Sequence, residues 1–357
     1  MMFDMKFKPR FLCLLCVFCL LCGGCQAEKA PQKFSASFYD AFDTVISFIG
    51  YTDSQASFDA VYEQVKELFM HYHRVYDGYK AYEGVHNLYY VNKNAASGPV
   101  EAEPELIELL LYMKDLQPRL LGRVNVAMGA VLSYWHECRE AGETLPEERL
   151  LRAYSNHVNF DDVIIDADAG TIYFADPHLS LDLGAVAKGY TTEIVASWLL
   201  TSGMTSYIIS AGGNVRCGDR PLDGRARWGV GIQDPDESLF STANSIKDVV
   251  YLRDMSVVTS GDYQRYYVVD GVRYHHIIDP DTLYPSAYMR QVTVVTRDSG
   301  YADALSTMLF LLPYEEGRAF VDSQPDIEAY WVLNDGSVQY TDGLQAILRS
   351  QGGSALD

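Results

Sequence analysis

"LDLGAVAKGYTTEIVASWLLTSG", residues 181–203, joins a short apolar run, two glycines and a longer segment whose apolar residues recur at helical spacing. The pattern predicts a strand that turns into a helix, with Gly203 as the helix C-cap. Backbone amides freed at such a turn, beside Lys188, can hold phosphate oxygens. The stretch matches neither the P-loop spacing nor GxGxxG, so on its own it is better interpreted as a structural turn.

The chain before this stretch is mostly helical by its pattern. "TVISFIGY" at 44–51 predicts a strand, and the apolar spacing that follows predicts a helix over 57–77 with Ser57 as its N-cap. Two further helices are predicted around 104–116 and 126–140.

From about residue 160 the chain changes to short β-rich runs between Gly and Asp turns. These runs occupy 162–166, 171–175, 206–210, 227–232, 248–252, 266–269 and 291–296. A further helix is predicted over 299–312. Without internal repeats or a linker after residue 35, the pattern indicates an α+β fold, built as one domain or as two interleaved lobes.

The first residues are typical of an export signal. A basic region with Lys6, Lys8 and Arg10 precedes the apolar run 11–21, which is too short to span a bilayer, and Gly23-Gly24-Cys25 follows. The segment resembles a bacterial lipoprotein signal, with Cys22 where Leu is usual, and plain secretion is the alternative. We therefore expect residues 1–24 to be a signal peptide, 25–35 a tether, and the body to lie outside the cytoplasmic membrane.

On this hypothesis the lipid on Cys25 holds the protein at the cell membrane. The whole chain carries a net charge of −20, and loss of the leader, with its net charge of +2, makes it more acidic still. So acidic a surface argues against non-specific nucleic-acid binding and against a polybasic membrane contact.

Cysteine usage excludes a disulfide framework. Five of the seven cysteines fall in the leader, which leaves Cys138 and Cys217 for the folded body. One bridge between them and two unpaired thiols are the alternatives, and unpaired thiols are favoured.

Other glycine-rich strand ends strengthen the case for a phosphate-bearing ligand. "ISAGGNVRCGD" at 209–219 ends a strand in paired glycines, where a ligand can approach the backbone closely, although a hairpin turn is favoured for this stretch in isolation. "VVTSGDYQRYY" at 257–267 presents Thr259 and Ser260 at another strand end, which as a lone motif indicates little. After the leader, no Ser-His-Asp elbow, CxxC pair or HExxH helix is present, so acyl-transfer and zinc chemistry lack support.

"YADALSTML" at 301–309 places Asp303, Ser306 and Thr307 at helical spacing i, i+3 and i+4. Their hard oxygen atoms suit Mg²⁺ or Ca²⁺ and suit zinc poorly. Helix capping by Asp303 is the alternative. The rest of the helix is apolar, so these oxygens would be buried and would need partners.

"RYHHIIDPDTLYP" at 273–285 puts two histidines side by side before a tight turn. Neighbouring side chains of a strand point to opposite faces, so His275 and His276 cannot both face one cleft. We expect one of them to take part in chemistry and the other to be structural. The spacing alone does not say which.

Together and in this order, "LDLGAVAKGY", "SAGGNVRCGD", "VGIQDP", "TSGDYQRYY", "HHIIDP" and "ADALST" resemble the ApbE family. The resemblance covers about residues 36–345, is densest after residue 178, and leaves 346–357 as a tail. It implies a T-fold-like α+β architecture with mixed β-sheets and packed helices. It also implies transfer of FMN from FAD to a Thr or Ser hydroxyl of an acceptor protein, with Mg²⁺ as cofactor and AMP as leaving group.

The resemblance also implies roles for individual residues. His276 would be the catalytic residue, and the main-chain oxygen of Ala185 would join Asp303 and Thr307 around magnesium, with Ser306 a further candidate ligand where some relatives carry Asp. The residues so implied to contact the flavin nucleotide are Phe42, Tyr79 or Tyr82, Asn125, Asp182, Lys188, Gly212, Gly213 and Ile277.

Three departures affect these assignments. Phe42 stands where relatives often have Met, Asn125 replaces an Asp, and Leu283 replaces a Gly. Two other functions stay open from the sequence. Water in place of an acceptor protein would make the chain an FAD pyrophosphatase that yields FMN and AMP. Without turnover it would be a flavin-binding lipoprotein.

Overall fold

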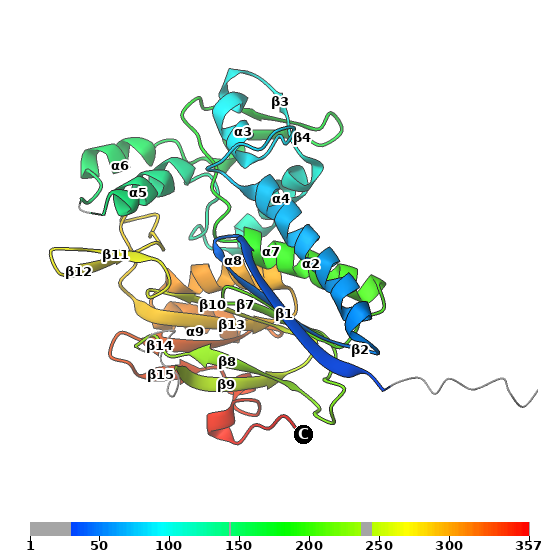
Figure 1. The fold of residues 1–357 in the computed structure, drawn as a ribbon. Coiled ribbons are helices and arrows are strands. Elements are labelled where there is room, and N and C mark those ends of the chain that lie inside the picture. Colours follow the sequence, from blue (N-terminus) through cyan, green and yellow to red (C-terminus); the bar gives the residue numbers. More distant parts are fainter. Residues whose placement is uncertain (1–29, 143, 237–244, 357) are drawn as a thin grey trace, which may run out of the picture.

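The computed structural model describes residues 30–142, 144–236 and 245–356, and its largest element is an eight-stranded sheet (Figure 1). The strand order is β1-β2-β6-β7-β10-β13-β14-β15, and every neighbouring pair is antiparallel. The strands span Gln32–Ala41 (β1), Thr44–Thr52 (β2), Tyr207–Ala211 (β6), Asn214–Cys217 (β7), Ser256–Gly261 (β10), Met289–Thr296 (β13), Glu328–Leu333 (β14) and Val338–Tyr340 (β15).

Helices cover one face of this sheet (Figure 1). They are α2 (Gln55–Tyr76), α7 (Ala187–Thr201), α8 (Ser299–Phe310) and α9 (Tyr314–Asp322). Phe48, Phe58 and Leu199 belong to one buried cluster between helices and strands, and Val292 and Leu309 belong to another. Full burial of such a side chain is worth roughly 1.5–3 kcal/mol relative to exposure. This packing fixes α7 and α8 over β7 and β10.

The opposite face is covered by the two-stranded ribbon of β8 (Trp228–Gln233) and β9 (Ile246–Leu252). Residues after 345 join this layer, because Leu348 is fully buried and the Ser350 amide donates to Asp248. The predicted tail 346–357 is therefore part of the fold as far as residue 356.

A second lobe is inserted between α2 and α7 (Figure 1). It contains α3 (Leu88–Asn94), α4 (Pro104–Leu116), α5 (Gly129–Ala141), α6 (Glu148–Tyr154) and a small sheet of β3 (Val100–Glu101), β5 (Thr171–Phe174) and β4 (Val163–Asp166). The hairpin of β11 (Tyr266–Val269) and β12 (Val272–His275), inserted between β10 and β13, packs on it through Trp135, Tyr267 and Tyr274. Of the two arrangements that the sequence left open, one domain or two interleaved lobes, the structure has the second.

Several local predictions were wrong. The helix cap is Ser54 rather than Ser57, since the Ser54 side chain accepts from the Ser57 amide. Residues 181–183 are irregular rather than a strand before α7. Among the described residues the named strands pair only in antiparallel fashion, so the expected mixed sheets are not found there, and parallel pairing is limited to the isolated bridge between Met128 and Ser180. β1 begins at Gln32, inside the predicted tether 25–35. The leader and Cys25 lie outside the described residues.

Two other expectations can be compared with the structure. Cys138 and Cys217 are both buried and free, as favoured from the sequence. Gly203 follows the end of α7 with a positive φ of 87°, as expected of a helix-terminating glycine. Across the described ranges, none of the helices has the length and apolar character needed to cross a bilayer.

Candidate active site

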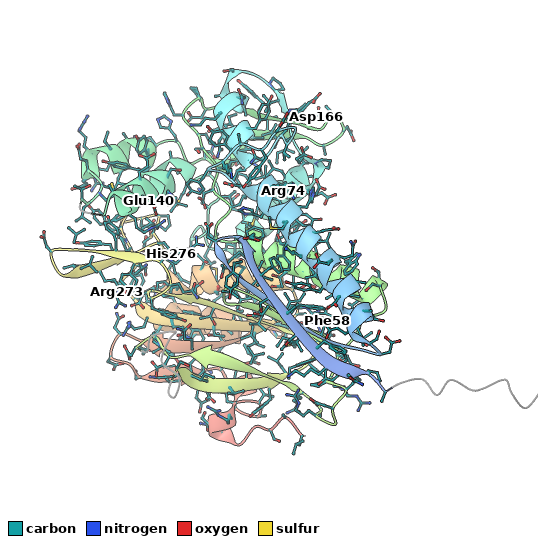
Figure 2. All side chains as sticks on the ribbon, viewed as in Figure 1. Phe58, Arg74, Glu140, Asp166, Arg273 and His276 are labelled. Atoms are coloured by element: carbon teal, nitrogen blue, oxygen red, sulfur yellow. The ribbon has the colours of Figure 1, made fainter. Side chains whose placement is uncertain are left out.

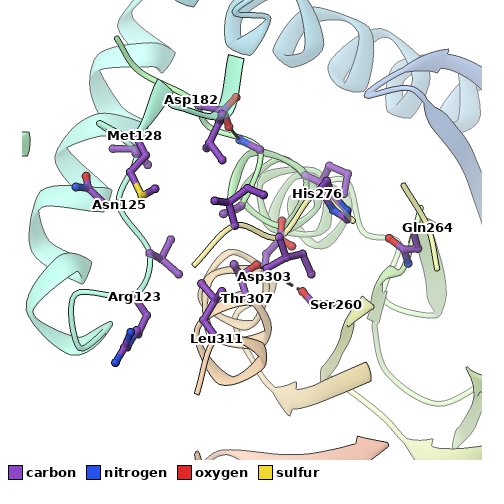
Figure 3. Close-up of a pocket in the computed structure, with 18 of the residues that line it drawn as sticks. Arg123, Asn125, Met128, Asp182, Ser260, Gln264, His276, Asp303, Thr307 and Leu311 are labelled. Carbon is purple, nitrogen blue, oxygen red and sulfur yellow. Dashed lines mark hydrogen bonds between the residues drawn. The ribbon is translucent and has the colours of Figure 1, made fainter. Parts of the chain in front are cut away.

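A cavity of about 120 Å³ and a groove of about 870 Å³ lie side by side and share wall residues, among them Asp182, Lys188, Gly212 and His276. The cavity wall comes from both lobes, as Figure 3 shows with Asn125 on one side and Asp303 on the other. The site therefore lies between the helix-covered sheet and the inserted lobe.

Asp303 lies in α8 with only 5% of its surface exposed. Its Oδ2 accepts a hydrogen bond of 2.9 Å from the Gly189 amide at the start of α7. Burial raises the pKa of this carboxyl, and Lys188, the Gly189 amide and Asn214 oppose the rise. The carboxylate is thus a buried acceptor whose charge is only partly compensated, which favours a cation nearby.

Thr307 lies one helical turn after Asp303 and also lines the cavity. Ser306 is fully buried and is not among the cavity-lining residues. Its hydroxyl lies 2.8 Å from the Ser260 hydroxyl and donates to the Asp303 carbonyl, while Ser260 lies 3.4 Å from Thr307 Oγ1 (Figure 3). The helix therefore brings two of the three predicted oxygen donors to the cavity and turns Ser306 towards β10.

The turn before α7 supplies three more predicted residues. Ala185 lines the cavity, and Lys188 lines both the cavity and the groove. Asp182 accepts the Gly184 amide at 2.8 Å and the Tyr79 hydroxyl at 3.3 Å. Asp182 thus holds the turn and links it to the inserted lobe.

The two histidines have different surroundings, as the alternation of a strand requires. His275 is buried, its Nε2 donates to the Ser286 carbonyl at 2.8 Å, and its Nδ1 accepts the Ile277 amide at 3.2 Å. Both ring nitrogens are therefore occupied by backbone. This is the structural histidine.

His276 is half-buried and lines both the cavity and the groove, where the β11–β12 hairpin meets the sheet (Figure 2). Its Nδ1 lies 3.2 Å from the Arg265 carbonyl. Desolvation by the surrounding protein lowers the pKa of His276 to about 3, and the positive charges of Arg265 and Lys188 contribute. The ring is therefore neutral in the free protein, with the lone pair of one ring nitrogen available to a hydrogen-bond donor.

The paired glycines Gly212 and Gly213 line the site at positions that disfavour a side chain. Gly212 lines both hollows with a φ of +54°, and an added Cβ would lie 2.2 Å from Thr44 Oγ1. Gly213 lines the groove with a φ of +96°. Phe42, also on the groove wall, has a positive φ of 54°. Phe42, which the family resemblance implies as a flavin contact, is thus placed at the groove.

Tyr79 lines the groove, whereas Tyr82 lies on neither wall. The Tyr82 hydroxyl is bound to Asp77 at 2.8 Å and lies 3.3 Å from His73. Of the two tyrosines that the sequence left open, the structure thus brings only Tyr79 to the site.

Asn125 and Ile277 line the cavity. The polar atoms of Asn125 are engaged by its own lobe, since the side chain donates to the Val158 carbonyl at 2.7 Å and accepts the Ala127 amide at 2.9 Å. Its contribution to the wall is thus mainly shape.

Sequence reasoning missed several residues of the site. Asn214 and Gln264 line the cavity, and Arg265 and Arg139 line the groove. Arg123 also lines the cavity and forms an ion pair of 2.5 Å with Asp281, in the turn that follows His276. Asn214 directly follows the paired glycines and Arg265 lies in the quoted "TSGDYQRYY", so their positions in the motifs were the available signal.

The oxygen set fits Mg²⁺. Among the described residues no cluster of three or more His, Cys, Asp or Glu side chains could hold a metal, and the cavity offers one buried carboxylate with a neighbouring hydroxyl. Mg²⁺ is usually bound through one or two carboxylates together with water and substrate phosphates. Asp303, Thr307 and Ala185 are the residues that would hold it.

Comparison with known proteins agrees with this geometry. The family model described as the ApbE family matches residues 42–331. The chain is 32% identical over 267 residues to a Treponema pallidum protein named FAD:protein FMN transferase, which covers 71% of this chain and 72% of that protein. It is 30% identical over 249 residues to a Klebsiella pneumoniae protein of the same name, and this match covers 70% of this chain and 75% of that protein.

Solved structures share the fold. The Thermotoga maritima ApbE protein superposes with a TM-score of 0.78 at 24% identity and covers 88% of this chain and 99% of its own. A flavin transferase ApbE from Vibrio cholerae gives a TM-score of 0.74 at 23% identity, with coverages of 89% and 99%. With the family model matching most of the chain and the motifs meeting at the cavity and the adjoining groove, the chain belongs to the ApbE family.

Proposed function

We propose that this protein transfers FMN from FAD to a Thr or Ser hydroxyl of another protein and releases AMP. The relatives that carry the name FAD:protein FMN transferase support the activity. The observation that carries it is the meeting of a neutral His276 with Asp303, Thr307 and Lys188 around one cavity beside a long groove.

The reaction requires a base and a site for the pyrophosphate. His276 takes the proton of the acceptor hydroxyl, whose oxygen forms a bond to the phosphorus nearest riboflavin. The bond from that phosphorus to the bridging oxygen breaks, and AMP leaves with the electron pair. The products are AMP and a phosphodiester between FMN and the acceptor side chain.

Lys188 supports this step with a positive charge at the wall that the cavity and groove share. The backbone at Gly212 lets the substrate approach closely. Mg²⁺ bound by Asp303, Thr307 and Ala185 would neutralise charge on the pyrophosphate oxygens. The groove, at about 870 Å³, is within the range of pockets that bind ligands of nucleotide size.

The test incubates the full chain with FAD, Mg²⁺ and a candidate acceptor protein, and follows the intact mass of the acceptor together with AMP. We expect the acceptor to gain one FMN moiety for each AMP released. Free FMN and AMP without an acceptor adduct would identify a pyrophosphatase. FAD that stays intact over days would identify a flavin-binding protein.

We also propose that lipid on Cys25 anchors the protein outside the cytoplasmic membrane. The basic leader region, the short apolar run and Gly23-Gly24-Cys25 support this location. The acceptor would then be a subunit of a membrane redox pump or an extracellular electron-transfer lipoprotein.

A further inference from the structure

Asn214 is a buried amide on the cavity wall without an evident structural purpose. It is the first residue of β7, follows Gly212-Gly213, and has 1% of its surface exposed. Its Oδ1 is buried and has no hydrogen-bond partner among the described residues. A buried polar atom left unsatisfied costs about 1–3 kcal/mol, so this oxygen calls for a partner that enters the cavity.

The orientation of the amide follows from its neighbour. Asn214 lowers the pKa of the Asp303 carboxyl, so its side chain lies close to that group. A carboxylate can only accept, so the NH₂ group faces Asp303 and Oδ1 must point elsewhere. The backbone of Asn214 is paired with Val258 in β10 and with Ala211 in β6, which fixes the position of the side chain.

The chemistry of the cavity wall restricts what the oxygen can bind. Asp303 contributes a carboxylate, and Ser260 and Thr307 contribute hydroxyls. An amide oxygen cannot pair directly with an oxygen of a phosphate, because both are acceptors. A cation, or water held by a cation, satisfies Oδ1 and is attracted to Asp303 at the same time.

We propose that Asn214 is a positioning residue for a divalent cation. Its NH₂ group holds the Asp303 carboxylate, and its Oδ1 is an oxygen partner of the hydrated ion. The proposal rests on the magnesium-dependent function proposed above and adds a residue to its cation site. It also explains why an asparagine rather than a small residue follows the glycine pair.

The test measures binding of Mg²⁺ alone, without FAD, to the full chain purified in detergent, by isothermal titration calorimetry and by the rise in Tm with Mg²⁺. Loss of a partner that orients a metal ligand typically lowers affinity about 10- to 100-fold, and we expect this for Asn214→Ala. Asn214→Asp keeps an oxygen at the Oδ1 position and should bind Mg²⁺ more tightly than Asn214→Ala.

Gln291 provides a matched control. It is also a buried amide of the large sheet with an unpartnered carbonyl oxygen among the described residues, and it does not line the cavity. Gln291→Leu should change Tm without changing Mg²⁺ affinity. Circular dichroism checks folding, and Asn214→Asp, which conserves size, decides the question if Asn214→Ala does not fold.

The outcomes separate the two proposals. If Asn214→Ala binds Mg²⁺ as tightly as the wild type, the role of Asn214 is refuted and the proposed function stands. If folded Asn214→Asp binds no better than folded Asn214→Ala, or has lost Mg²⁺ binding where Asn214→Ala does not fold, the role of Oδ1 is refuted. If the wild type itself binds no Mg²⁺ without FAD, the protein does not hold the cation by itself and this inference is refuted, while the acceptor assay still decides the proposed function.

Discussion

The main-chain carbonyl oxygen of Arg265 lies close to two nitrogen atoms of His276, 3.1 Å from the backbone amide and 3.2 Å from Nδ1. A carbonyl can only accept, so in the neutral ring Nδ1 carries the proton and Nε2 is the acceptor. Arg265 also donates from its side chain to the Phe42 carbonyl at 3.2 Å. One residue thus fixes the tautomer of His276 and joins its loop to the β1–β2 turn.

The first prediction concerns the two histidines. His276→Ala should still bind FAD but should transfer FMN at least about 10²-fold more slowly, because loss of a general base typically costs about 10² to 10⁴ in rate. His275→Ala should stay within roughly tenfold of the wild type and should instead lower Tm, since it leaves the buried Ser286 carbonyl and Ile277 amide unpaired. Single-turnover flavinylation of an acceptor peptide and thermal melts measure both effects.

The reverse result would reassign the site. If His275→Ala were the slow variant and His276→Ala retained activity, the base would be His275. FAD binding to each variant, measured by fluorescence quenching, separates a lost base from a lost substrate site.

The second prediction concerns pH. Since the pKa of His276 is lowered to about 3, mainly by desolvation and further by Arg265, its ring should stay neutral from pH 5 to 8 in the free protein. The ring C–H resonances of His276, assigned with a His276→Gln variant, should not shift in this range. Arg265→Gln removes a positive charge and should raise this pKa. A midpoint near 6.5 in the wild type would contradict the buried, cation-flanked environment.

The third prediction concerns Asp303. Asp303→Asn keeps the shape of the side chain and removes its charge, so the variant should lose the rise in Tm that Mg²⁺ gives the wild type. Turnover should fall by orders of magnitude, since a catalytic metal supplies several kcal/mol of transition-state stabilisation. Unchanged activity of Asp303→Asn at limiting Mg²⁺ would show that the metal site does not include Asp303.

The fourth prediction concerns location. Replacing Cys25 with Ser removes the proposed lipidation site and should release the protein from membranes. Fractionation after a high-salt wash measures this, with the unaltered chain as reference. Cys25→Ser that still sediments with membranes would refute the lipoprotein hypothesis.

Periodicity predicted much of the fold. The helix at 104–116 and the strands near 163–166 and 171–174 were found because their burial follows the helical or the alternating period. β1 was missed because its polar residues continue the polar segment that was interpreted as a tether. Phe34, Ala36 and Phe38 nevertheless alternate as a strand requires. The tail was missed because the burial of Leu348 depends on a distant ribbon.

The candidate site was predictable where motifs adjoin regular elements. Asp303, Lys188 and the glycine pair lie at the ends of strands or on helices, so their positions followed from the local pattern. The choice between Tyr79 and Tyr82, and the hydrogen bonds from His276 to Arg265, depend on how the inserted lobe folds back. Single-sequence patterns carry no information on such contacts between lobes.

The fifth prediction tests whether the close packing of α7 and α8 sets the cation site. A Cβ at Gly189 would lie 2.3 Å from the Ser299 carbonyl oxygen and 2.5 Å from Asp303 Cβ, so Gly189→Ala must separate the two helices. Overpacking of this kind costs about 1–3 kcal/mol, and the shift should also weaken the 2.9 Å hydrogen bond from the Gly189 amide to Asp303. We expect a lower Tm together with weaker Mg²⁺ binding. Gly317→Ala, in the helix α9, is the control. Its Cβ would make only ordinary contact with Leu309 of α8, so it should leave Mg²⁺ binding unchanged. If Gly189→Ala lowered Tm with Mg²⁺ affinity intact, the helix contact would stabilise the fold without positioning Asp303.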